Sequence, residues 1–137
     1  MRMAGEMKQT ANSTQGRPTT KALGDAAEAQ ALQHLRRQAM TLISRNYRTP
    51  GRGGGEIDLI MRDTDGTLVF VEVRSRSQAT HGGAGASITS RKQQRIIRAA
   101  RHYLMRLSTW PACRFDVVVI ESDGEPQWIK AAFDATT

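Results

Sequence analysis

The sequence predicts a single mixed α/β domain in which a central sheet lies between helices. The predicted order of elements is α-β-β-β-α-β-β, because two segments have helical periodicity and five have the alternation or composition of strands. The 137 residues contain no internal repeat and suffice for one core without disulfides. We expect the domain to span residues 21–133, between a disordered polar tail over residues 1–20 and a short tail over residues 134–137.

The composition is strongly basic, with a formal net charge of +7 and a pI near 10.5. Arginine supplies most of the excess, and its forked guanidinium group binds phosphate, so the charge favours a nucleic-acid partner. Solubility or an acidic protein partner would explain the charge as well. The one cysteine, Cys113, excludes an internal disulfide and a cysteine-cluster zinc site. Without a membrane-length apolar run or a signal-peptide core, the expected location is cytoplasmic, with no membrane partner.

The first expected element is an amphipathic helix over residues 21–40. Its apolar and small side chains recur at three- and four-residue spacing. Glu28 falls in line with Leu32 and Leu35, on the side that should be buried. Periodicity leaves two interpretations open, a border residue that turns out to water or a carboxylate placed toward the sheet.

A first strand is expected over residues 41–48, and the turn-forming segment 49–55 ends it. This segment contains four glycines but lacks the Gly-Lys-Ser/Thr ending of a phosphate-binding P-loop. We expect it to supply flexibility, with Arg48 and Arg52 available to a backbone phosphate.

The next two strands, over residues 56–63 and 67–76, should form a hairpin through the three-residue loop 64–66, which ends in glycine. Pairing of Asp63 with Thr67 would set the register and bring six side chains to one face. These are the opposed pairs Ile60 and Phe70, Asp58 and Glu72, and Glu56 and Arg74. The opposite face is entirely apolar and must be buried: Ile57, Leu59, Met61, Val69, Val71 and Val73. A different turn would shift this register by one residue.

After a glycine-containing segment over residues 78–86, which we expect to be mobile, Thr89 or Ser90 can cap a second helix that runs to about residue 107. One face of this helix carries basic side chains of a single sign: Arg91, Arg95, Arg98, His102 and Arg106. Such a stripe is often a solvated face, but no acidic residue relieves it, which favours phosphate binding. Lys92 and Gln93 would approach the hairpin or the DNA backbone, or serve only as polar residues of the first turn.

Two last strands are expected over residues 113–121 and 127–133, with a turn at Asp123-Gly124. Asp116 interrupts the apolar face of the first of these strands. We expect it to be a hydrogen-bonded structural residue and not a catalytic one.

Two carboxylates opposed on adjacent strands are the minimal site for a hard divalent cation, here Mg²⁺ or Mn²⁺ at Asp58 and Glu72. Like charges at this range raise one pKa unless a cation lies between them, and Arg74 would supply part of that compensation. A bound metal would polarise a phosphodiester and activate water. The alternative is a ladder of cross-strand ion pairs on a solvated face, with no metal.

The spacing of Asp58, Glu72 and Arg74 resembles the PD-(D/E)XK nuclease superfamily. Its pattern is an Asp on one strand and a Glu-X-Lys on the next, and the Asp and the Glu hold the metal. Further segments together resemble the YraN-like family of small, uncharacterised bacterial proteins, over residues 21–133. They are Gly-Glu-Ile-Asp-Leu-Ile at 55–60, Val-Phe-Val-Glu-Val-Arg at 69–74, Lys92-Gln93, Arg-Phe-Asp-Val-Val at 114–118 and Trp-Ile-Lys-Ala-Ala-Phe at 128–133.

The resemblance implies a restriction-endonuclease-like fold, a mixed central sheet flanked by helices. It also implies a metal-dependent endonuclease that hydrolyses phosphodiester bonds of structured or branched DNA. Asp58, Glu72 and the backbone carbonyl of Val73 would hold Mg²⁺ or Mn²⁺. Glu28 would be a third catalytic acid, similar to the helical carboxylate of Holliday-junction resolvases. By analogy with junction-cutting enzymes, two copies of the chain would form a homodimer.

Arg74 departs from the nuclease pattern, which has lysine at this position. Arginine stays protonated at physiological pH, so it cannot take a proton from water, although it can stabilise a charged phosphate. The alternative function is therefore a non-catalytic nucleic-acid-binding protein that retains the nuclease fold. In either case the expected nucleic-acid contacts are Arg48, Arg52, Arg91, Lys92, Gln93, Arg95 and Arg98.

Overall fold

The computed structural model describes residues 19–76, 88–122 and 124–135, and it confirms the predicted order of elements. The elements are α2 (Thr20–Arg37), β1 (Thr41–Arg48), β2 (Glu56–Arg62), β3 (Leu68–Arg76), α3 (Ser90–Leu104), β4 (Cys113–Glu121) and β5 (Gln127–Phe133). The expected disordered tail, apart from its last two residues, and the expected mobile segment 78–86 lie outside the described residues. None of the described helices is long and apolar enough to cross a membrane.

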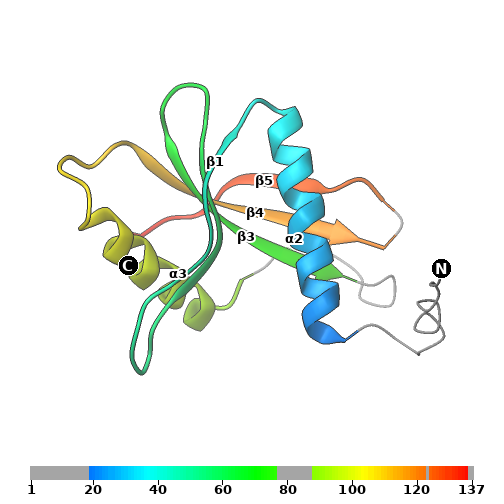
Figure 1. Cartoon of the computed structure of the whole chain (residues 1–137), viewed down its shortest axis with the longest axis horizontal. Helices are drawn as coiled ribbons and strands as arrows, with labels where there is room; N and C mark the ends of the chain where they lie inside the picture. Colours follow the sequence, from blue (N-terminus) through cyan, green and yellow to red (C-terminus); the bar gives the residue numbers. More distant parts are fainter. Residues whose placement is uncertain (1–18, 77–87, 123, 136–137) are drawn as a thin grey trace, which may run out of the picture.

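The five strands form one mixed sheet in chain order, β1-β2-β3-β4-β5 (Figure 1). Neighbouring strands are antiparallel except β3 and β4, which run parallel because α3 carries the chain back across the sheet. The central strand β3 is buried along its first half, from Leu68 to Glu72. The fold is thus the mixed α/β domain that the sequence predicts.

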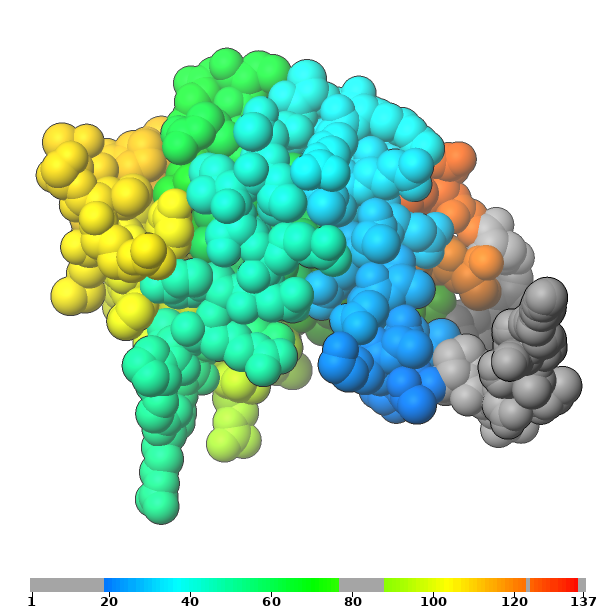
Figure 2. Space-filling view, in the orientation of Figure 1, coloured from blue at the N-terminus to red at the C-terminus, as the bar shows by residue number. Residues whose placement is uncertain are grey.

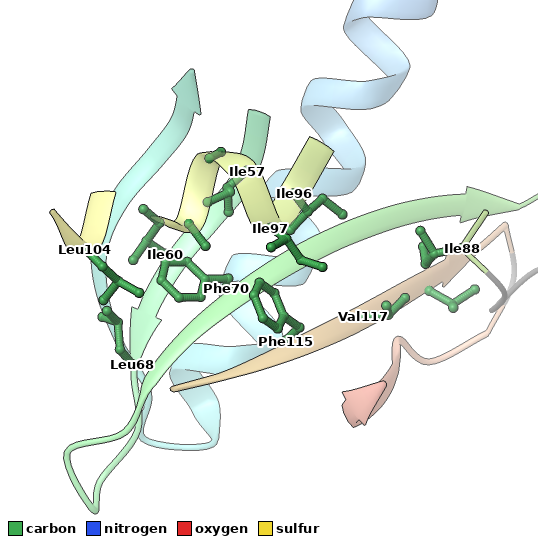
Figure 3. Packing of buried hydrophobic residues seen from close by; sticks show 13 residues of the cluster. Ile57, Ile60, Leu68, Phe70, Ile88, Ile96, Ile97, Leu104, Phe115 and Val117 are labelled. Atoms are coloured by element: carbon green, nitrogen blue, oxygen red, sulfur yellow. The ribbon is translucent and has the colours of Figure 1, made fainter. Parts of the chain in front are cut away.

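The two helices cover opposite faces of the sheet and create two separate apolar clusters. The cluster under α3 is built around Phe70, which stacks on Phe115 at 5.4 Å between ring centroids (Figure 3). The cluster under α2 contains Leu35 from the helix and Val71 from the sheet, both fully buried. Each face of β3 therefore meets a helix, which explains why its sequence is almost continuously apolar.

Both helices end earlier than their periodicity predicts. The last turn of α2 is closed by the N–H of Met40, which donates to the carbonyl of Leu35 at 3.1 Å, while Ala39 adopts a left-handed φ of 70°. Helix α3 ends at Leu104, and the N–H of Arg106 and of Leu107 each bond three residues back, as in a tightened final turn.

The hairpin register agrees with the prediction over the residues that pair. Ile60 lies opposite Phe70, and the N–H of Asp63 donates to the carbonyl of Thr67 at 2.9 Å. Gly66 takes the left-handed φ of 90° that the loop requires. The predicted loop therefore sets the register from its closed end.

The predicted alternation of faces is wrong for Ile57. The two residues were expected to share one buried face, but Leu59 packs in the cluster under α2 and Ile57 in the cluster under α3. The neighbouring strand explains this, because Asn46 has a φ of 51° and lies between the residues that pair with Leu59 and Ile57. A left-handed residue interrupts the pleat, so the strand pair changes face at this point. Asp58 lies between Ile57 and Leu59, the two residues that pack in different clusters.

Asp116 is the hydrogen-bonded structural residue that the sequence predicts. Its carboxylate is fully buried and accepts from Nε of Arg114 at 3.0 Å and Nε1 of Trp128 at 2.9 Å. It also accepts from the N–H of Ala131 at 3.0 Å, at a bulge where Ala131 has a φ of 51°. Arg114 pairs in addition with Asp63 at 2.9 Å. This network therefore fastens β5 to β4 and ties both to the hairpin loop.

Candidate functional site

The candidate site lies where β2 and β3 separate. Their pairing extends only to Leu59 and Val71. Beyond it, the backbone N–H of Val73 donates to Oδ2 of Asp58 at 2.8 Å, so a side chain takes over a bond that a strand would otherwise make. This bond fixes the Asp58 carboxylate beside Glu72, the residue expected opposite it.

Glu72 is the more strongly perturbed member of the pair. Only 6% of Glu72 is exposed, and burial together with the charge and hydrogen bonding of Asp58 raises its pKa to about 8. Burial also raises the pKa of Asp58, against the hydrogen bond from Val73, which lowers it. Two carboxyl groups in one desolvated site cannot both ionise without cost, so Glu72 retains a proton at neutral pH.

This shift predicts a pH dependence of stability. The folded-state pKa of Glu72 lies above its ordinary 4.5, so the contribution of Glu72 to stability is full below about pH 4.5 and is lost as the pH rises to about 8. We expect the metal-free protein to lose about 1.4 kcal/mol for each unit by which that pKa is raised. Urea unfolding at about pH 5 and about pH 9 measures the loss, which Glu72→Gln should largely remove.

The matched control for this measurement is Glu125→Gln, the same chemical change at an exposed loop position. It should leave the pH dependence of the wild type unchanged. A Glu72→Gln protein that loses stability with pH as steeply as the wild type would show that the proton is held elsewhere.

Glu28 turns toward the sheet, which settles the two interpretations of its helical position. Burial and the nearby charge of Asp58 raise its pKa, while Arg45 opposes this shift. Its Oε1 atom is buried without a hydrogen-bond partner among the described residues. Helix α2 therefore brings a third carboxyl group to the pair. We call Glu28, Asp58 and Glu72 the carboxylate site.

The carboxylate site fits a cation that keeps most of its own water. Within residues 19–76, 88–122 and 124–135, no three His, Cys, Asp or Glu side chains form a ready-made metal cluster. Mg²⁺, however, is commonly held by one or two carboxylates, with water and substrate phosphate oxygens as the other ligands. The unpartnered Oε1 of Glu28 and the costly proximity of Asp58 and Glu72 are the features that such a cation would relieve.

Two cationic residues were expected near the carboxylates, Arg74 on β3 and Lys92 on α3. Arg74 follows Glu72 on β3, is partly buried and lies in register with Val119 of β4. Lys92 comes from the first turn of α3, and its Nζ lies 3.5 Å from Oε2 of Glu72. The structure therefore places Lys92 at the carboxylates, a position that sequence analysis left open.

Gln93, by contrast, bonds to the backbone of the segment before α3. Its Nε2 donates to the carbonyl of Ile88 at 2.9 Å and so holds the segment before α3 in place. Its role is to anchor the start of the helix.

A basic pocket lies between α3 and the segment 49–55, and its lining includes Glu56, two residues before Asp58. Its volume is about 810 Å³, and it contains four of the seven residues predicted to contact nucleic acid. These are Arg48, Arg91, Arg95 and Arg98. Arg52, Lys92 and Gln93 do not line it. Spacing alone predicted the grouping of the three helical arginines, but not the strand and loop that complete the pocket.

The segment 49–55, which was expected to supply flexibility, is hydrogen-bonded within itself and to α3. In Figure 2 it stands out from the body as a narrow projection. At its base, the N–H of Gly55 donates to Oγ1 of Thr49 at 2.6 Å. The segment is also bonded to α3, because Arg98 donates to the carbonyl of Gly53 and Arg95 to the carbonyl of Gly54. A Cβ atom on Gly55 would lie 2.0 Å from the backbone oxygen of Arg95, so only glycine permits this close approach.

The chain matches the family model described as "Uncharacterised protein family UPF0102" over residues 27–120. It is similar to a "UPF0102 protein" of Albidiferax ferrireducens, 66% identical over 117 residues, which are 85% of this chain and 91% of the relative. A "UPF0102 protein" of Paracidovorax citrulli is 62% identical over 117 residues, covering 85% and 86% of the two chains. A relative in Methylibium petroleiphilum is 58% identical over 121 residues and is covered to 98% of its length. These names state no activity.

Proposed function

The chain belongs to the uncharacterised protein family UPF0102, which is the YraN-like family that its sequence resembles. From this premise we propose that the protein is a metal-dependent endonuclease acting on structured or branched DNA. The observation that carries the proposal is the carboxylate site, in which the buried Glu72 and the half-buried Asp58 meet where the hairpin strands separate and α2 adds a third carboxyl group. The ion pair between Lys92 and Glu72 does not by itself account for three carboxyl groups gathered in one place, because like charges repel.

Asp58 and Glu72 would hold Mg²⁺ or Mn²⁺, with the backbone carbonyl of Val73 as a further ligand. A bound metal supplies a water of lowered pKa and neutralises charge on the phosphate. The bond from the N–H of Val73 fixes Asp58 for this task. Because Glu72 carries a proton at neutral pH, cation binding at this residue releases a proton and strengthens as the pH rises toward 8.

Glu28 and Arg74 have separate roles in the proposal. Glu28 has a raised pKa and an unpartnered oxygen, so it suits a group that takes a proton from the attacking water. Arg74 keeps its positive charge and stabilises the negative charge that develops on the phosphate. The basic pocket would hold the DNA backbone next to the cleaved bond.

The test is a cleavage assay with Mg²⁺ and Mn²⁺ on linear, flapped and four-way DNA, with a chelator as the blank. We expect metal-dependent cutting of the flapped or four-way substrate in preference to the linear duplex. No cutting of any of the three substrates with either metal would overturn the proposal.

The second candidate is a nucleic-acid-binding protein without cleavage, which the basic pocket and Arg74 favour. Four arginines line that pocket, and backbone phosphate is the ligand that such a surface attracts regardless of sequence. This candidate accounts for the pocket but does not explain why carboxyl groups lie together in a desolvated site.

A prediction about salt applies to both candidates. Arg48→Gln combined with Arg91→Gln removes one charge from each wall of the pocket and spares the two arginines that bond the loop. If each removed charge contacts one phosphate, the slope of log affinity against log salt should become shallower by about 0.9 per charge. Fluorescence anisotropy with labelled duplex DNA measures the slope.

The control is Arg36→Gln combined with Arg37→Gln, which removes two exposed charges from the end of α2. This variant should keep the slope of the wild type. An equal change in both variants would mean that overall charge, and not the pocket, attracts DNA.

A further inference from the structure

The carboxylate site contains a lysine, although β3 does not provide it. In the nuclease pattern a lysine follows the strand glutamate by two residues, and here that position is Arg74. The ammonium group of Lys92 instead reaches Glu72 from α3, with 3.5 Å between Nζ and Oε2. Its charge also acts on Asp58, where it opposes the rise in pKa that burial causes. Lys92 is therefore near both proposed metal ligands.

The start of α3 is built to hold Lys92 in this position. Thr89 caps the helix, and its Oγ1 accepts from the N–H of Lys92 at 3.1 Å. Ile88 is buried in the cluster under α3, and the bond from Gln93 to its carbonyl ties the first turn to it. The backbone that carries Lys92 is thus anchored on both sides of the cap, so the side chain starts from a fixed point beside the sheet.

The exposure of the pair shows where a ligand can approach. The Glu72 side chain is 7% exposed, whereas the Lys92 side chain is 39% exposed. The ammonium group has three donors, and Glu72 occupies only one side of it. Lys92 can therefore face a phosphate oxygen from solvent while it remains next to the carboxylates.

We propose that Lys92 is a catalytic residue of this site, its ammonium group taking the place that the nuclease pattern gives to a lysine at position 74. The inference rests on the proposed function. Lys92 donates a hydrogen bond to a non-bridging oxygen of the phosphodiester that is cut. A compact ammonium group fits between the carboxylates and a phosphate. The guanidinium group of Arg74 is wider and does not replace it there.

A purely structural role for Lys92, as the ion-pair partner of Glu72, makes different predictions. Such a partner would hold the carboxylate in place, so its removal would weaken metal binding and cleavage together. A phosphate-contacting lysine competes with the metal for Glu72 only by its charge, so its removal would leave Mn²⁺ affinity unchanged or higher.

The test compares Lys92→Met with Lys21→Met, the same chemical change at a side chain that is 86% exposed on α2. We expect Lys92→Met to lower kcat for metal-dependent cleavage by about a hundredfold or more, a loss typical of one stabilising donor, while Mn²⁺ affinity does not fall. Lys21→Met should cut like the wild type. Unchanged kcat, or a parallel loss of Mn²⁺ binding, would overturn the proposal.

A relocation variant gives a second readout. Arg74→Lys introduced into the Lys92→Met protein restores an ammonium group on the strand, and we expect it to recover cleavage by about tenfold or more. If cleavage does not recover, an ammonium group at position 74 cannot replace that of Lys92, and the proposed equivalence of the two positions is wrong.

The failure of the two proposals can be told apart. If the wild type cuts no DNA, the proposed function has failed, and Mn²⁺-dependent binding of a short single-stranded oligonucleotide decides the role of Lys92. If Lys92→Met weakens oligonucleotide binding by about tenfold and Lys21→Met does not, Lys92 is a phosphate-binding residue. Equal binding by both variants would overturn it.

Discussion

Asp58→Asn and Glu72→Gln are each expected to reduce DNA cleavage by at least about a hundredfold and to remove measurable Mn²⁺ binding. Each change keeps the shape of the side chain but removes the negative charge that a hard cation requires. The loss should be large because the described site provides only these two carboxylates on adjacent strands, so neither can substitute for the other. Isothermal titration calorimetry with Mn²⁺ and the cleavage assay measure the two effects on the same samples.

Asp25→Asn and Glu125→Gln are the matched controls, since both make the same chemical change at exposed positions outside the site. They should bind Mn²⁺ and cut DNA like the wild type. Glu72→Gln should also be at least as stable as the wild type above about pH 8, since it removes a buried carboxylate that resists ionisation. Loss of activity without loss of fold separates this site from a structural one. Full activity in both site variants would place the chemistry elsewhere.

Asp116→Ala is expected to destabilise the fold strongly, by about 3–5 kcal/mol. The buried carboxylate accepts from Arg114, Trp128 and the backbone of Ala131, so its removal leaves three donors without their acceptor. For a domain of this size the melting temperature should fall by about 10 °C or more. Thermal unfolding followed by circular dichroism measures it.

Asp63→Ala gives the comparison, because Asp63 pairs with the same arginine at 2.9 Å but is less buried. We expect a clearly smaller loss of stability, since the bonds from Trp128 and Ala131 to Asp116 remain. A melting temperature of Asp116→Ala within a few degrees of the wild type would show that the network contributes little. Such a result would require β5 to be held by its apolar contacts alone.

Local signals in the sequence predict much of the fold and the two strand carboxylates. The loop that ends in Gly66 sets the register of the hairpin, and alternation on both strands then places Asp58 near Glu72. Asp116 is predictable for a similar reason, because a lone carboxylate in an apolar strand must find hydrogen bonds. In each case the information lies within a few residues or in one pair of neighbouring strands.

The parts that could not be predicted depend on contacts between distant segments. Asn46 adopts a left-handed backbone that its sequence neighbours do not require, and this moves Ile57 to the other face. The segment 49–55 is fixed by side chains of α3 more than forty positions away, as in the bond from Arg95 to Gly54. Lys92 reaches Glu72 only because α3 packs on the sheet, which neither periodicity nor charge pattern reveals.

The placement of the helices has a consequence for when the site comes into being. Glu28 is carried by α2 on one face of the sheet and Lys92 by α3 on the other, so the two side chains reach Asp58 and Glu72 from different layers. During synthesis α2 and the hairpin leave the ribosome before α3 exists. The nascent chain thus carries its three acids for some time without the lysine, and the complete set of charges assembles only after both layers have docked.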